Sequence, residues 1–282
     1  MHLLSSPVAP PDAAAEPPAL VFRTVLAGVA NLAWRNRRVR VDEDAWLILD
    51  GCEPCSVQID PEARTRMLVV AISRAEREAA FAAAADAAAG CAPFDVAVTG
   101  EPGALVNCGF AENLRSRDGP AGRRLLAIAR SRAGGRPPGA ERSDRVALVQ
   151  EAIAEEFVLR RKAARIACVK QATREQLLRR ILLATDFIAS RHDEPLSLDE
   201  MARAASLSRF HFVRLFSLVH GETPHAFLLR KRTAVARRHL ATGSACSEAA
   251  TRAGFGSRSA LFRNLRKTDP PTTGHEPCSL FA

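Results

Sequence analysis

Two short helices with caps, joined by a tight turn, constrain the fold of this chain most strongly. The segment "SLDEMARAASL" begins at Ser197 and places a glutamate three residues after this serine, which is the spacing of a capping box. The segment "SRFHFVRLFSLV" begins at Ser208, which is placed to cap a second helix. The small side chains of Ala202, Ala204 and Ala205 allow two helices to cross closely. This pattern predicts a helix-turn-helix motif.

The second helix of this motif has two apolar faces. One face, at the spacing i, i+3, i+4, i+7, consists of Phe212, Leu215, Phe216 and Val219, and we expect it to be buried. The opposite face repeats the spacing with Phe210, Val213, Arg214 and Ser217. A helix in the major groove can use such a face, because apolar groups touch thymine methyls and arginine donates to guanine O6 and N7. The residues that we predict to contact DNA are Arg209, Phe210, His211, Val213 and Arg214, and Arg214 is the leading candidate.

Positive charge is concentrated in the same part of the chain. The 282 residues carry a formal net charge of +9 at pH 7. The segment from Leu196 to Lys267 holds 13 Lys and Arg against 4 Asp and Glu, so it accounts for the whole excess. Phosphate neutralisation supplies most of the affinity of non-specific DNA binding, so this segment fits double-stranded DNA as a partner. Charge alone fits a solvated surface equally well.

From Thr173 to Lys267 the sequence resembles the AraC type of transcription regulators. The residues that carry the resemblance are Arg214 to Phe216, Gly221, Thr223, Pro224, Phe227, Leu228, Arg232, Ala236 and Leu240. The resemblance implies two helix-turn-helix units joined by one long helix, about Pro224 to Thr242. This helix would hold two recognition helices one turn of DNA apart, about 34 Å.

The resemblance also places a second recognition helix in "AGFGSRSALFR", with Gly254 in the turn and Ser257 at the N-cap. It implies DNA contacts from Arg258, Ser259, Ala260 and Arg263. The core-facing positions of this helix are Leu261, Asn264, Leu265 and Thr268, half of which are polar. The closing run "TDPPTTGHEPCSLFA" also lacks the aromatic residue that AraC-type sequences usually carry after the proline at this point. We therefore interpret the stretch as a second DNA reader with a thin core, and the alternative is a regulator-derived DNA binder with a degenerate second motif.

Helix boundaries and charges in this part of the chain give further expectations. "TREQ", from Thr173 to Gln176, has the spacing of a capping box and predicts the start of a helix, which "RHDEP" ends. On the linking helix, Lys231, Arg237 and Arg238 are expected to form an exposed charged face. The AraC pattern instead implies a structural role for Arg232.

The first half of the chain predicts a different architecture. Short strands alternate with turns between Val21 and Ser73, which suggests a small β-barrel or sandwich, and Arg74 to Ala89 favours a helix. Ser143 to Val169 predicts a long amphipathic helix with Val146, Val149, Ile153 and Phe157 on its apolar face. This helix either packs on the strands or mediates dimerisation. "RRVRVDEDAWLILDG" resembles the cupin-like sensor region of AraC-type regulators.

The predicted fold class is therefore α+β, with a cupin-like amino-terminal barrel and an all-helical carboxy-terminal part. The expected division is a disordered leader at 1–20, an effector or dimerisation domain at 21–140, a linking and dimerisation helix at 141–172, a double helix-turn-helix domain at 173–268 and an atypical tail at 269–282.

Catalytic and metal-dependent functions are disfavoured. No histidine lies between His2 and His192, which excludes a histidine-ligated metal site in the barrel. Cys52 and Cys55 are either part of a plain turn or a thiol pair for redox or metal sensing. A repair methyltransferase would need an activated nucleophilic cysteine, and no supporting Cys/His arrangement stands near these thiols. We expect no enzyme activity, no metal and no cofactor.

The remaining expectations concern location and partners. The chain has neither a signal-peptide pattern nor an apolar run that suits a membrane, and its seven cysteines are scattered, so we expect a cytoplasmic protein with reduced thiols. The expected partners are DNA, a second copy in a homodimer and an unknown small-molecule effector, with RNA polymerase as a further partner of an activator. The sequence thus predicts a sequence-specific DNA-binding transcription regulator.

Overall fold

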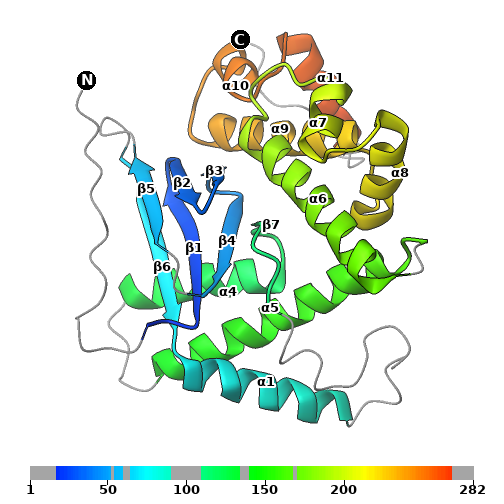
Figure 1. The fold of residues 1–282 in the computed structure, drawn as a ribbon. Coiled ribbons are helices and arrows are strands. Elements are labelled where there is room, and N and C mark those ends of the chain that lie inside the picture. Colours follow the sequence, from blue (N-terminus) through cyan, green and yellow to red (C-terminus); the bar gives the residue numbers. More distant parts are fainter. Residues whose placement is uncertain are drawn as a thin grey trace, which may run out of the picture.

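The computed structural model describes residues 17–51, 54–59, 64–89, 109–133, 140–167 and 170–268 (Figure 1). The described part has strands in its first half and helices in its second, so the predicted α+β class is confirmed. The expected leader, apart from residues 17–20, and the tail at 269–282 lie outside the described residues.

The strands form two antiparallel sheets. One sheet has the order β6-β1-β4-β7, and the other has the order β3-β2-β5. The strands are β1 (Leu20–Ala27), β2 (Ala30–Trp34), β3 (Arg37–Val41), β4 (Ala45–Asp50), β5 (Cys55–Ile59), β6 (Arg66–Ile72) and β7 (Leu114–Ser116). The prediction of short strands between Val21 and Ser73 is therefore confirmed. A cupin-like character stays a prediction.

Strand β4 is buried along almost its whole length because both of its faces are covered. Trp46 and Ile48 belong to a core between the larger sheet and the helices of the first half. Leu47 and Leu49 alternate with them and belong to a second core, which joins the two sheets. Because successive side chains of a strand point to opposite faces, a strand between two cores is apolar throughout.

Three helices cover the outer face of the larger sheet (Figure 1). They are α1 (Arg74–Ala89), α4 (Pro120–Ala133) and α5 (Ala140–Ala164). The predicted bounds of α1 are confirmed, whereas α5 begins and ends earlier than the predicted helix from Ser143 to Val169. The apolar face of α5 packs on the sheet as expected: Val149 and Ile153 are buried, and Val146 and Phe157 pack against them. Its role in dimerisation stays a prediction.

The second half of the chain is helical. Its helices are α6 (Gln171–Ser190), α7 (Leu198–Ala204), α8 (Arg209–His220), α9 (Pro224–Ala241), α10 (Cys246–Arg252) and α11 (Arg258–Thr268). Helix α6 ends before Arg191, as "RHDEP" predicted. The capping box at Thr173 is wrong, because α6 already begins at Gln171, with Lys170 at its N-cap and no side-chain cap. Thr173 therefore lies inside the first turn, where its hydroxyl has no capping position.

Helix α6 fastens the helical half to the sheets through one buried carboxylate. Asp186 is 3% exposed, and its Oδ1 accepts a hydrogen bond of 2.9 Å from the backbone N–H of Leu114 in β7. Its Oδ2 pairs with the guanidinium of Arg37 in β3. Nearby, the backbone N–H of Arg40 donates to Ser190 Oγ at 3.0 Å. These contacts place the end of α6 against the edge of the smaller sheet.

No helix in the described ranges is long and apolar enough to cross a membrane.

The buried carboxylate of Asp186 should make the stability of the folded protein depend on pH. Burial raises the pKa of Asp186 to about 7, against the opposing effects of Arg37, the Leu114 amide and Arg115. Between about pH 4 and 7 the folded state therefore keeps a proton on Asp186 that the unfolded state has released. Asp186 contributes to stability at low pH, and this contribution is lost as the pH rises from about 4 through 7. Between about pH 5 and 8 the free energy of unfolding should fall by about 2 to 3 kcal/mol relative to the Asp186→Asn variant.

Denaturant unfolding of both proteins across this pH range measures the effect. Asparagine keeps an oxygen acceptor for the Leu114 amide but does not titrate, so it serves as the reference. Parallel pH curves for the two proteins would contradict the prediction.

Candidate nucleic-acid interface

The first helix-turn-helix motif is formed by α7 and α8 and by the caps that the sequence predicts. Ser197 and Glu200 form a complete capping box, with Glu200 Oε2 accepting from the Ser197 backbone N–H at 2.8 Å. Ser208 caps α8 by accepting from the backbone N–H of His211 at 3.4 Å. In the turn, Leu207 donates from its backbone N–H to the Ala202 carbonyl at 3.0 Å. Local hydrogen bonds thus set where each helix begins.

One face of α8 is fully packed. Phe212, Leu215, Phe216 and Val219 are all at most 5% exposed, which confirms the predicted core face. The Phe216 ring lies 5.4 Å from Phe212 and 5.6 Å from Phe227, measured between centroids, and both contacts are edge-on. His220 closes this cluster, with its Nε2 2.8 Å from Thr185 Oγ1 in α6. Burial, with the charges of Lys162 and Arg230, lowers the pKa of His220 to about 4, so its ring is neutral at pH 7.

The opposite face of α8 is only partly as expected. Phe210 is 81% exposed, and Arg214 and His211 are exposed beside it. Val213 and Ser217 are half-buried, and Val213 packs in part against the core of the motif. Arg209 is exposed and pairs with Asp199 of α7 at 3.1 Å. The exposed apolar and basic side chains are therefore gathered at the first turns of α8.

Helix α9 connects the two motifs. Thr223 caps it by accepting from the backbone N–H of Ala226 at 3.2 Å, and Pro224 occupies its first turn, where the missing N–H costs nothing. Arg232 donates to the carbonyls of His192 and Glu194, both at 2.6 Å. These bonds agree with the structural role that the resemblance implied for Arg232. They tie α9 to the loop after α6.

The second motif, α10 and α11, repeats the plan of the first. Gly254 lies in the turn with φ +78, and a Cβ there would meet the His192 carbonyl oxygen at 2.7 Å. Ser257 Oγ accepts from the backbone N–H of Ala260 at 3.2 Å, as expected of an N-cap. On the outer side, Arg258, Ser259 and Arg263 are exposed, whereas Ala260 is half-buried and packs against the small core. The second motif thus exposes two arginines and a serine on its outer side.

The core of the second motif is smaller than that of the first. Its buried members are Val235, Ala236, Ala250, Ala253, Phe255 and Leu261, and Leu265 is only half-buried. Asn264, at a core-facing position, donates from Nδ2 to the Ala260 carbonyl at 2.8 Å, inside its own helix. The first motif instead packs on α5 and α6 and contains the Phe212, Phe216 and Phe227 cluster. The prediction of a thinner second core is confirmed for the residues that the structure describes.

Comparison with known families agrees with this geometry. Residues 201–269 match the family model of a helix-turn-helix domain of the AraC type. Residues 201–269 are therefore part of a helix-turn-helix domain of the AraC type. No curated protein matches the chain in sequence.

Solved structures that are similar to this chain include those of ToxT from Vibrio cholerae. One is 11% identical with a TM-score of 0.35, and the match covers 89% of this chain and 86% of ToxT. A second, with bound unsaturated fatty acid, is 10% identical with a TM-score of 0.31, covering 89% and 84% of the two chains.

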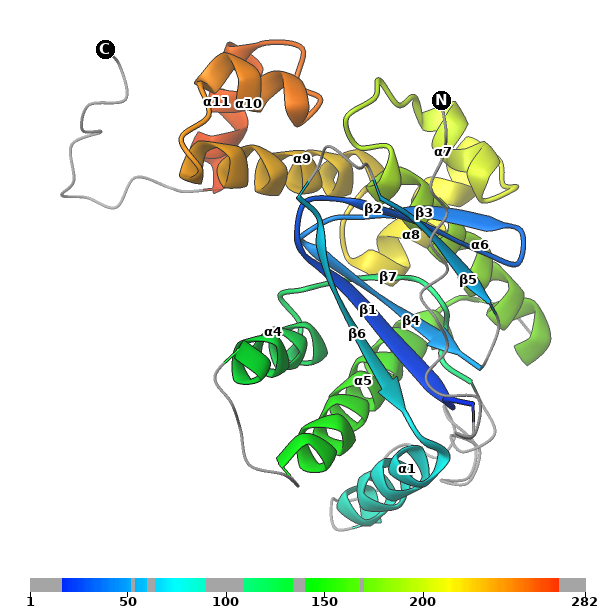
Figure 2. The ribbon, with the colours of Figure 1, turned by 90° about the vertical axis from the view of Figure 1, so that its left-hand side faces the viewer.

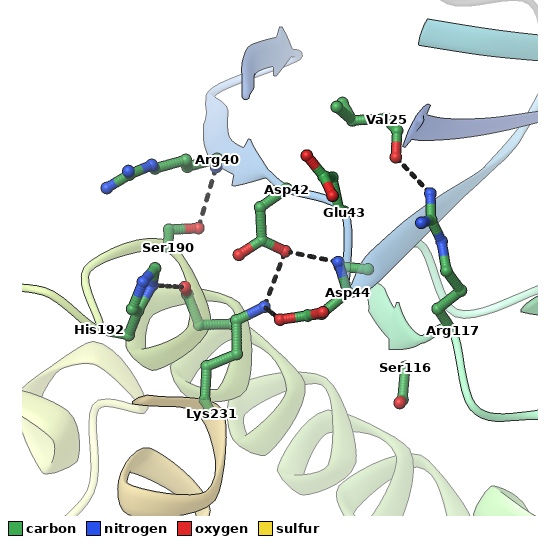
Figure 3. Close-up of polar contacts among 12 residues, drawn as sticks. Val25, Arg40, Asp42, Glu43, Asp44, Ser116, Arg117, Ser190, His192 and Lys231 are labelled. Atoms are coloured by element: carbon green, nitrogen blue, oxygen red, sulfur yellow. Dashed lines mark hydrogen bonds and ion pairs between the residues drawn. The ribbon is translucent and has the colours of Figure 1, made fainter. Parts of the chain in front are cut away.

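Two cations on α9 contradict the sequence prediction. Lys231 and Arg238 were expected on an exposed face. Lys231 instead points to the turn between β3 and β4 (Figure 3), and Arg238 pairs with Asp44 of the same turn. Lys231 Nζ lies 2.7 Å from Asp42 Oδ1, and its side chain is only 11% exposed. The amphipathic pattern of α9 cannot reveal these partners, because they are almost two hundred residues away in the chain. Three consecutive acidic residues at 42–44 were the only available signal, and they also fit an ordinary turn.

The structure gives no support to redox or metal sensing by Cys52 and Cys55. Cys52 lies outside the described residues, and Cys55 is half-buried at the start of β5. Burial raises the pKa of the Cys55 thiol, although Arg23 and a backbone hydrogen bond at Ala33 oppose this effect. A raised pKa keeps the thiol protonated and less reactive. Within the described ranges, no three His, Cys, Asp or Glu side chains gather in a way that would hold a metal ion.

The difference between the two cores predicts a difference in local stability. The backbone amides of α11 should exchange hydrogen faster than those of α8, because fewer buried apolar contacts oppose local opening. Native-state hydrogen exchange, read by mass spectrometry on peptides from each helix, measures this. Protection factors in α11 equal to those in α8 would show that the thin core does not lower its stability.

Proposed function

We propose that this protein is a DNA-binding transcription regulator of the AraC type. It binds double-stranded DNA through α8 and α11, and α9 positions these two helices so that they enter successive segments of the major groove. The residues proposed to contact DNA are Arg209, Phe210, His211, Val213, Arg214, Arg258, Ser259, Ala260 and Arg263. Phosphate contacts from the basic region would orient the protein, and a few side chains on each recognition helix would read bases.

The observation that carries this proposal is the exposed first half of α8. Phe210 is 81% exposed beside an exposed arginine, and aromatic side chains and arginine are the residue types that surfaces use to bind partners. In the major groove, the same Phe210 can cover a thymine methyl while Arg214 donates to a guanine. The fully buried opposite face fixes the rotation of α8, so this exposed side has no other core to enter.

The proposal also assigns roles to the other parts of the chain. The residues at 21–140 would form an effector or dimerisation domain of cupin-like type, 141–172, which contain most of α5, would link the domains, and 173–268 would form the DNA-binding domain. Two facing antiparallel sheets support the cupin-like interpretation, but a small-molecule effector, a homodimer, activation and contact with RNA polymerase stay predictions. A DNA-binding role agrees with the cytoplasmic location expected from the sequence.

Arg214→Ala tests base reading by α8. Loss of a bidentate contact to guanine should weaken binding by about 1 to 3 kcal/mol and relax sequence preference at that position. Selection of bound sites from random duplexes, followed by gel-shift titration of the selected site, measures both quantities. Arg66→Ala is the matched control, since it removes the same charge from an exposed position on β6. Equal effects of the two substitutions on affinity and preference would rule out Arg214 as a base reader.

The length of the footprint tests the second reader. Two competent recognition helices per subunit should protect two successive major-groove segments, about 34 Å apart. A regulator-derived binder with a degenerate second motif should protect only one. Hydroxyl-radical footprinting on the selected site, with the Arg258→Ala/Arg263→Ala variant as control, distinguishes them. A footprint that the double substitution leaves unchanged would favour a single reader.

A further inference from the structure

A second concentration of positive charge lies just before the first helix-turn-helix motif. The segment at 157–180 contains eight Lys and Arg residues against one acidic residue, Glu175, so its net charge is +7. The cations are Arg160, Arg161, Lys162, Arg165, Lys170, Arg174, Arg179 and Arg180. They belong to the end of α5, the first half of α6 and the link between these helices. The segment lies outside residues 201–269, so the match to a helix-turn-helix domain does not account for it.

Several of these cations face water without a carboxylate beside them. Arg161, Arg165 and Arg179 are exposed, and none of the three forms an ion pair with another residue in the ranges that the structure describes. Exposed arginines elsewhere often have such a partner, as Arg252 has in Glu248 at 2.8 Å. The positive charge of this surface is therefore left for an anion from outside the described part of the chain.

Two cations of α6 lie beside the turn that precedes α8. Arg180 is half-buried and donates from Nη1 to the carbonyl of Ser206 at 3.4 Å, in the turn between α7 and α8. Arg179 is its exposed neighbour on α6. The turn leads directly into Ser208, the N-cap of α8, and the exposed Phe210 follows in the first turn of that helix. Arg180 therefore lies at the same end of α8 as Phe210.

The cations of α5 lie near the other end of α8. Burial lowers the pKa of His220, the last residue of α8, and the charge of Lys162 lowers it further, which shows that Lys162 is close to this ring. Ala163, the next residue, is buried in the apolar core that α5 shares with α8. Arg161 and Arg165 flank these two positions in the sequence and are exposed. Cations from α5 and α6 thus lie near the two ends of α8.

The two ends of a helix that reads the major groove lie close to phosphates. The major groove of B-DNA is about 12 Å wide, whereas a helix of 12 residues such as α8 is about 18 Å long. Groups fixed near the ends of α8 would therefore approach the two sugar-phosphate backbones that border the groove. Arginine suits this position, because its guanidinium can donate two parallel hydrogen bonds to one phosphate. Since α5 and α6 share an apolar core with α8, these arginines would reach the DNA together with it.

We propose that Arg179 and Arg180 at one end of α8, and Arg161 and Arg165 at the other, bind the DNA phosphates that border the major-groove segment entered by α8. We call these four residues the flanking cations. This inference rests on the proposed DNA binding and extends the interface beyond the two helix-turn-helix motifs. Contacts to phosphates carry no base information, so the flanking cations supply affinity and fix the placement of the first motif, whereas base contacts supply sequence preference.

The salt dependence of binding counts these contacts. Each lost phosphate contact should reduce the magnitude of the slope of log K against log salt concentration by about 0.9. We expect Arg179→Ala/Arg180→Ala to reduce it by about 2 and to weaken binding about 10-fold at physiological salt. The probes are a random-sequence duplex pool and the selected site, and both should lose the same factor. Arg161→Ala/Arg165→Ala should give a similar reduction, and an unchanged slope would overturn the contacts at that end of α8.

The control for net charge is Arg130→Ala/Arg132→Ala. These two arginines are exposed in the last turn of α4, which lies well apart from α8 in both views of the molecule (Figures 1 and 2). The control removes the same charge as each double variant of the flanking cations, but it should leave the slope unchanged. Equal slopes for the control and for Arg179→Ala/Arg180→Ala would overturn the proposal.

A loss of folding must be separated from a loss of phosphate contacts, because Arg180 also bonds to the turn. Arg179→Ala alone removes an exposed side chain, so it should reduce the slope by about 1 and leave Tm unchanged. Arg180→Lys keeps the positive charge and should retain the wild-type slope. A wild-type slope in Arg179→Ala, together with a lowered Tm in Arg180→Lys, would assign Arg180 a structural role and contradict the proposal.

Ethylation interference on the selected site locates the contacts. Ethylation neutralises one phosphate at a time, so it weakens binding only where the protein contacts that phosphate. We expect interfering phosphates at both borders of the segment that α8 enters. Those at one border should lose their effect in Arg179→Ala/Arg180→Ala and keep it in Arg130→Ala/Arg132→Ala. The same interference pattern in both variants would contradict the proposed contacts.

Failure of this inference is distinguishable from failure of the proposed function. Wild-type protein that binds no duplex at any salt concentration contradicts DNA binding itself. Wild-type protein that binds DNA, with slopes that neither double variant of the flanking cations changes, contradicts only the phosphate contacts. An acidic protein surface would then be the better partner for this charge.

Discussion

The buried carboxylate of Asp186 is the contact on which the arrangement of the two halves depends. It lies on α6, accepts from the Leu114 amide and pairs with Arg37, so one side chain joins a helix to both sheets. A buried charge that lost these partners would be strongly destabilising, which restricts α6 to one position against β3. Because α7 and α8 pack on α6 through a shared apolar core, the first helix-turn-helix motif takes its place from this contact.

The two motifs differ in how they are supported. The first shares a core with α5 and α6, and its phenylalanine cluster leaves α8 little freedom to rotate. The second has a small core of its own and is positioned mainly by α9, with Gly254 against the loop after α6. A rigid first motif and a more adjustable second one follow from this difference.

Much of the fold and of the candidate site was predictable because it depends on local patterns. Alternation and turn residues predicted the strands, the period of 3.6 predicted the core face of α8, and Ser197, Ser208 and Ser257 act as the caps that their spacing indicated. Some local expectations differ from the structure for physical reasons. Thr173 has the spacing of a cap, but α6 begins earlier, at Gln171. Val213 lies on the outer side of α8 but is half-buried, because neighbouring elements of the motif pack over it.

The sequence by itself determined the two classes of secondary structure and the helix-turn-helix pattern, because caps, periodicity and charge act over a few neighbouring residues. Only the tertiary structure decided which charges face water. Lys231 and Arg238 have the spacing of an exposed face on α9, yet they pair with Asp42 and Asp44 in the turn between β3 and β4. Pairing across such a separation depends on how whole layers pack, and no pattern within one helix encodes it.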